Sequence, residues 1–172
     1  MCESPPQVAV PDADALASGD GSSFRRILVP IRHARDAVDT LAVAANVCHE
    51  TKGVLRLVHV RIFDPPMRSA GRFYPETVSE AATVADEALP VAWAYGVPAT
   101  TTVVEAQRGY IASAIARQAA VWPADVIVMT RRPSSAFWRF VMGSIPDQVM
   151  RRATCPVLAV HPKPKANRRD TR

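Results

Sequence analysis

The feature that most constrains the fold is a regular alternation of short apolar runs with longer amphipathic stretches. The first run, Arg26 to Ile31, is branched and almost continuously apolar, which is typical of a strand buried on both faces. A helical pattern follows, with Asp36 as its expected cap and Lys52-Gly53 as its end, and a second buried run begins at Val54. This order predicts a right-handed strand, helix, strand crossover.

The same alternation continues along the chain. Strands are expected at 26–31, 54–60, 100–105, 125–129 and 156–160, and helices at 36–52, 76–96, 111–122 and 144–152. We expect a kink at Pro90 in the second helix and a long loop from Arg61 to Pro75. The pattern predicts one three-layer α/β domain whose five-stranded, mostly parallel sheet carries helices on both faces.

Length and composition place this domain at residues 24–162. The 172 residues fit a single domain. Residues 1–23 carry four acidic and no basic residues, residues 163–172 carry five basic residues and one acidic residue, and both are expected to be flexible tails. No window resembles a membrane span or a secretory signal, so we expect a cytoplasmic protein with no membrane partner.

Charge and cysteines argue against two further classes of function. The net charge of +5 is not concentrated in a basic stripe with interleaved aromatic residues, so nucleic acid is not an expected partner. Cys2, Cys48 and Cys155 are widely spaced and are expected to be reduced structural thiols.

Ligands of such sheets bind outside the carboxyl ends of the strands, where the strand order reverses. Residues Pro30 to Arg35 and Thr130 to Ser144 follow the first and fourth strands. These two segments are therefore the expected binding region.

Three stretches resemble the universal stress protein family. They are Ile27 to Ile31, Val126 to Met129, and above all Met142-Gly143-Ser144-Ile145 leading through Arg151-Arg152-Ala153 to Cys155-Pro156-Val157-Leu158-Ala159-Val160. The resemblance covers about Phe24 to Val160. It implies a Rossmann-like, adenine nucleotide alpha hydrolase-like fold with strand order 3-2-1-4-5, and a homodimer paired through the last strand, Pro156 to Val160.

One branch of the family binds ATP through a loop of a glycine, two residues, a second glycine, nine residues, and a final glycine followed by Ser or Thr, and this branch has an Asp just after the first strand. Here Thr130 and Pro133 stand at the first two glycine positions, Arg32 stands at the Asp position, and Gly143-Ser144 matches. A β-branched residue in a left-handed conformation costs roughly 1–2 kcal/mol, proline has no N–H, and arginine accepts no hydrogen bond. We therefore expect a degraded ATP loop and no required cofactor.

An alternative keeps a nucleotide, with loop arginines in place of the glycines. Arg32, Arg131 and Arg132 would then hold the phosphates, although solvated surface arginines explain the same residues. The family pattern would carry over to Pro30, Ile31, Val60, Met129, Gly143, Ser144 and Ile145. For these residues plain core packing and a helix cap are the competing interpretation.

Catalysis has little support in the sequence. His33, His49, His59 and His161 are scattered, as surface or satisfied core histidines are, and no base and nucleophile pair is evident. The sequence thus favours a non-catalytic universal stress protein, a homodimeric regulatory or binding module. A small hydrolase or phosphotransferase is the second alternative.

Three aromatic residues lie between the fourth strand and the last helix. Phe137, Trp138 and Phe140 are costly to expose among arginines. They are expected either to pack on the helix or the dimer mate, or to bind a partner protein.

Overall fold

The computed structural model describes residues 24–65, 71–131 and 144–162. Its centre is a parallel sheet in the order β3-β2-β1-β4-β5. The strands are β1 (Arg26–Ile31), β2 (Val54–Phe63), β3 (Ala99–Gln107), β4 (Val126–Thr130) and β5 (Val157–Val160). The predicted fold class and strand order are confirmed.

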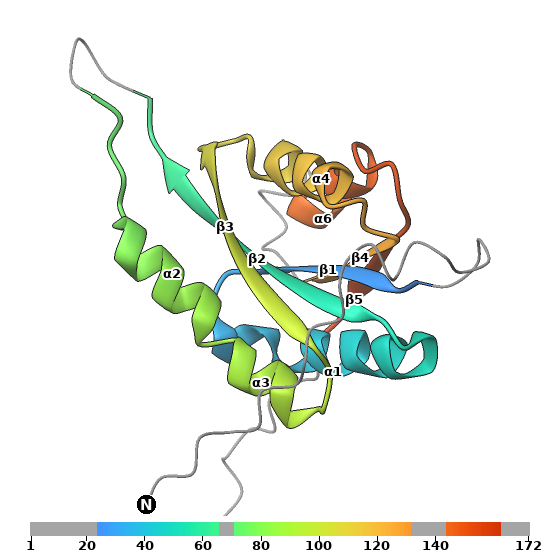
Figure 1. Cartoon of the computed structure of the whole chain (residues 1–172). Coiled ribbons are helices and arrows are strands. Elements are labelled where there is room, and N and C mark those ends of the chain that lie inside the picture. The colour runs from blue at the N-terminus through green and yellow to red at the C-terminus, as the bar shows by residue number, and fades with distance from the viewer. Residues whose placement is uncertain (1–23, 66–70, 132–143, 163–172) are drawn as a thin grey trace, which may run out of the picture.

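Helices cover both faces of this sheet (Figure 1). One face packs against α1 (Ala34–Thr51), α2 (Val78–Asp86) and α3 (Leu89–Ala94), and its core includes Ile27, Leu41 and Leu55. The other face packs against α4 (Ile111–Val121) and α6 (Ile145–Met150), around Leu28, Val58 and Ile127. Alternate strand residues point to opposite faces, so both faces of the central strands are apolar.

The helix boundaries correct two expectations. Helix α1 begins at Ala34, and its N-cap is His33 without a side-chain bond, so Asp36 lies in the first turn and does not cap the helix. The predicted second helix is two helices, because Pro90 has no N–H to continue α2 and sits instead in the first turn of α3.

The predicted start of the long loop, at Arg61, is also wrong. Strand β2 continues to Phe63, and its last residues pair with β3 in the register Arg61↔Glu105 to Phe63↔Gln107. Strand β1 ends earlier, opposite His59. The ends of β2 and β3 therefore extend beyond β1, toward the upper left of Figure 1.

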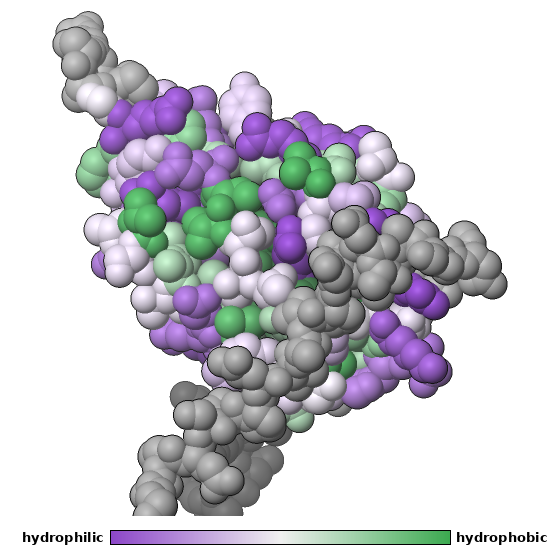
Figure 2. Space-filling model, in the orientation of Figure 1, coloured by the Kyte–Doolittle hydropathy of each residue, from purple (hydrophilic) through white to green (hydrophobic). Residues whose placement is uncertain are grey.

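The side of the molecule seen in Figure 2 carries the edge strand β3. Most β3 residues are half-buried, and hydrophobic residues form patches between α2 and β3 with hydrophilic residues around them. Among the described residues, no helix is long and apolar enough to cross a membrane.

Candidate functional site

The expected binding region lies where the chain leaves β1 and β4. Strand β1 is flanked by β2 on one side and β4 on the other, so the order of the sheet reverses at this point. Pro30 is half-buried, Ile31 is buried, and Arg32 is exposed just beyond the strand. The region holds an arginine where the resemblance would place a carboxylate.

The end of β4 is tied to the protein on both sides. Met129 is buried in the core beneath α4 and α6. The Thr130 hydroxyl lies 2.6 Å from the hydroxyl of Thr40 on α1, and the Arg131 N–H donates to the Val160 carbonyl at 2.7 Å. The sheet ladder thus continues through the residues at which the glycine loop would begin.

Ser144 caps the short helix α6. Its hydroxyl donates to Asp147 at 2.7 Å and accepts from the Asp147 N–H at 3.3 Å, while the Asp147 carboxylate also accepts from the Ser144 N–H. These bonds from Ser144, together with Arg131 at 3.5 Å, hold the pKa of Asp147 below its ordinary value. Arg131 and Ser144 therefore meet at one carboxylate.

The remaining candidate residues divide between the core and the parts outside the described structure. Val60 and Ile145 are half-buried and pack against the core of the α4 and α6 face. Arg132 and Gly143 lie outside the described residues, and so do Pro133 and the aromatic group Phe137, Trp138 and Phe140. The two expected tails are also outside them.

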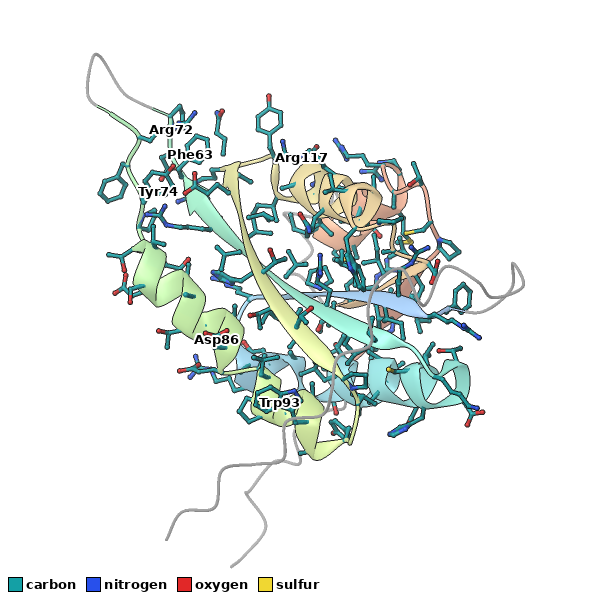
Figure 3. The ribbon with its side chains drawn as sticks, viewed as in Figure 1. Phe63, Arg72, Tyr74, Asp86, Trp93 and Arg117 are labelled. Carbon is teal, nitrogen blue, oxygen red and sulfur yellow. The ribbon has the colours of Figure 1, made fainter. Side chains whose placement is uncertain are left out.

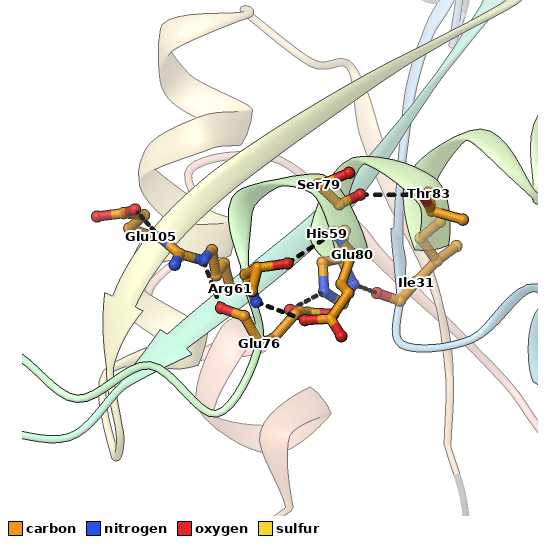
Figure 4. A network of polar contacts seen from close by, with 9 residues as sticks. Ile31, His59, Arg61, Glu76, Ser79, Glu80, Thr83 and Glu105 are labelled. Carbon is orange, nitrogen blue, oxygen red and sulfur yellow. Dashed lines mark hydrogen bonds and ion pairs between the residues drawn. The ribbon is translucent and has the colours of Figure 1, made fainter.

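The structure adds a polar network that the sequence did not indicate. His59, which is 6% exposed, places Nδ1 3.2 Å from the Ile31 carbonyl and Nε2 2.9 Å from Oε2 of Glu76 (Figure 4). A lone histidine in an apolar strand is usually a satisfied core group, and His59 is satisfied in this sense. Its carboxylate partner, 17 residues away, had no sequence signal.

Arg61 extends the network toward β3. Its Nε donates to the Glu76 carbonyl at 2.9 Å, and its Nη1 donates to Oε1 of Glu105 at 2.7 Å. The Tyr74 hydroxyl donates to the same carboxylate, and this bond together with Arg61 lowers the pKa of Glu105. The charge of the buried Arg61 is thus matched, which explains how an arginine can be buried within β2.

Aromatic rings and guanidinium groups stack around this network. The Arg61 guanidinium lies 3.7 Å from the centre of the Tyr74 ring, and the Arg72 guanidinium lies 4.6 Å from that of Phe63. The Phe63 and Tyr74 rings are 5.6 Å apart, and Figure 3 shows these labelled residues together at the end of β2. The stack holds the segment before α2 against the sheet.

Neither described cysteine has the environment of a nucleophile. Burial raises the pKa of the Cys48 thiol to about 11, and burial also raises the pKa of the Cys155 thiol. Both thiols are therefore protonated at neutral pH. Within 24–65, 71–131 and 144–162, no group of three His, Cys, Asp or Glu side chains could hold a metal ion.

The fold is that of a doubly wound α/β protein, and the candidate residues after β1 and β4 lie where its strand order reverses. The model of the universal stress protein family matches residues 23–161. The chain belongs to the universal stress protein family.

Solved structures of the family share the fold. A universal stress protein in complex with cAMP is 19% identical, with a TM-score of 0.65 over 81% of this chain and 99% of that chain. One from Archaeoglobus fulgidus in complex with dAMP is 22% identical, with a TM-score of 0.59 over 80% and 98%. One from Burkholderia pseudomallei is 23% identical, with a TM-score of 0.60 over 82% and 98%. A comparison with curated protein sequences finds no significant match.

Proposed function

We propose that this universal stress protein is a non-catalytic, homodimeric regulatory or binding module of the cytoplasm, and that it works without a bound nucleotide. The observation that carries the proposal is that polar groups near the end of β4 are already bonded within the protein. The hydroxyls of Thr130 and Ser144 and the guanidinium of Arg131 are each engaged by another protein group.

The chemistry of these residues supports the same conclusion. A phosphate-binding loop needs several free N–H groups that curl around the anion, which glycines allow and β-branched residues disfavour. Here the Arg131 N–H bonds Val160, and Pro133 has no N–H. Arg32 cannot accept a hydrogen bond from a ribose or from water on a metal ion.

Calorimetric titration of the nucleotide-stripped protein tests this proposal. We expect no heat of binding with Mg-ATP, ADP, AMP, cyclic AMP or inorganic phosphate up to about 1 mM, a limit near −4 kcal/mol. A dissociation constant below roughly 100 μM for any of them, about −5.5 kcal/mol, would contradict it.

A second candidate function is nucleotide binding through arginines. Arg131 keeps 44% of its side chain exposed although it pairs with Asp147, and Arg32 is exposed, so both guanidinium groups are accessible to an anion. Two solved relatives are in complex with cAMP and with dAMP. If the titration gives binding, this candidate predicts that Arg32→Ala and Arg131→Ala each weaken it, while Arg117→Ala on α4 leaves it unchanged.

The homodimer is proposed to form through β5. This strand is the edge of the sheet beyond β4, and Leu158 on it is 41% exposed. An apolar, partly exposed edge strand favours pairing with a second copy. We expect Leu158→Arg to convert a dimer into a monomer in sedimentation velocity at micromolar concentration.

Val121→Arg is the matched control for this substitution, because Val121 is 72% exposed and lies on α4, outside the edge strand β5. It should leave the sedimentation coefficient unchanged. A wild-type monomer, or a Leu158→Arg variant that stays dimeric, would refute pairing through β5.

A further inference from the structure

The buried pair of His59 and Glu76 connects three parts of the molecule. His59 lies in β2, bonds the end of β1 through Nδ1 and the Ile31 carbonyl, and reaches the segment before α2 through Glu76 (Figure 4). The side chain of His59 is 8% exposed and that of Glu76 is 25% exposed. Solvent therefore has little access to the bond between them.

The two contacts can both be hydrogen bonds only when the His59 ring carries two protons. A carbonyl oxygen only accepts hydrogen bonds, so Nδ1 of His59 must carry a proton to bond Ile31. A carboxylate also only accepts, so Nε2 must carry a second proton to bond Glu76. A ring that makes both bonds at once is therefore doubly protonated and positively charged.

We propose that the His59–Glu76 pair is a proton-binding site that helps to hold the segment Gly71 to Thr77 against the sheet and loosens this segment when the Nε2 proton leaves. After that loss, the Nε2 lone pair and the Glu76 carboxylate would face each other at 2.9 Å, where both are acceptors. The contact must then open.

The other contacts of this segment do not involve the His59 ring. Arg61 donates to the Glu76 carbonyl and stacks on Tyr74, and the Asp64 N–H donates to the Phe73 carbonyl. They keep the segment near the sheet when the pair opens. The expected change is thus a local loosening that reaches the start of α2, where Thr77 is the N-cap.

Charged groups on the neighbouring elements define the electrostatic setting of the ring. Glu80 on α2 is bonded by Thr77, and Glu105 on β3 is bonded by Arg61 and Tyr74. The other charged or histidine side chains on the elements packed around β2 are Arg26 on β1, Arg32 and His33 after it, Arg35, Asp36, Asp39, His49 and Glu50 on α1, Asp86 on α2, and Arg117 on the opposite face.

Because of the position of this pair, protonation of His59 affects two parts of the structure at once. Ile31, whose carbonyl the ring holds, directly precedes Arg32 at the candidate site. The same ring holds the segment leading into α2. Protonation thus links the end of β1 to α2 without any nucleotide, which goes beyond the proposed function and is independent of it.

Two measurements on the full-length protein test the proposal. Nitrogen NMR of the imidazole should show both His59 nitrogens protonated at pH 6 and only Nδ1 protonated at pH 9. Hydrogen exchange, corrected for the intrinsic pH dependence and compared with α4, should become at least about tenfold faster in residues 71–80 over the same range, the size expected for loss of a charged hydrogen bond.

The Glu76→Gln variant tests whether the contact depends on the Nε2 proton. The glutamine amide can donate to the unprotonated Nε2, so this variant should keep the segment protected at both pH values. His161→Gln is the matched control, because His161 is exposed, and it should retain the wild-type pH dependence.

Either of two results would overturn the proposal. One is a His59 ring that carries a single proton at pH 6 with the protein folded. The other is a Glu76→Gln variant whose exchange in residues 71–80 changes with pH as in the wild type. Neither result depends on the outcome of the nucleotide titration.

Discussion

Gly53→Ala should destabilise the protein by about 3 kcal/mol, a large effect for the addition of one methyl group. A Cβ atom at Gly53 would overlap the Arg25 carbonyl oxygen and would lie 2.9 Å from the carbonyl carbon and Cα of the same residue. These are backbone atoms that cannot rotate away. The same carbonyl accepts from the Val54 N–H at 2.7 Å, so moving it would disturb the first rung between β1 and β2.

The measurement is urea unfolding of the wild type, Gly53→Ala and the matched variant Gly71→Ala. A Cβ atom added at Gly71 would meet no other group within 4 Å, so this substitution should change the free energy of unfolding by no more than about 0.5 kcal/mol. Equal effects at the two positions would show that the close approach at Gly53 does not determine its role.

The part of the fold that could be predicted from the sequence is the part set by the pattern of apolar residues. Leu28, Val58 and Ile127 lie in runs whose only stable arrangement is a sheet covered on both faces, and all three are fully buried. The pattern failed at Arg61, because a charged residue reads as the end of an apolar run. Its burial depends on Glu105 and Tyr74, which lie far away in sequence.

At the candidate site, the sequence could predict the residues at the strand ends but not the contacts made by distant segments. The rule for strand ends located Ile31 and Thr130 without a structure. The same rule could not pair His59 with Glu76, because that contact depends on how an aperiodic segment folds back onto β2. Tertiary contacts of this kind are set by packing and have no local sequence signature.

If the wild type binds no nucleotide, as proposed, the combined variant Arg32→Asp, Thr130→Gly and Pro133→Gly should gain Mg-ATP binding. The substitutions restore the acceptor after β1, the conformational freedom after β4 and one backbone N–H. The absence of these three features costs roughly 3–6 kcal/mol of binding free energy, so restoring the features should improve the affinity for ATP by about 100-fold to 10,000-fold. Calorimetry under the conditions used for the wild type measures the gain.

The cost and the specificity of this variant can be checked separately. Losing the hydrogen bond between Thr130 and Thr40 should lower the free energy of unfolding by about 1 kcal/mol, which leaves a folded protein. Arg117→Asp makes the same charge change as Arg32→Asp at an exposed residue of α4, and it should bring no ATP binding. If the combined variant is folded and still binds no ATP, the three substituted positions do not account for the proposed absence of nucleotide binding, and the bonds that engage Arg131 and Ser144 become the explanation to test.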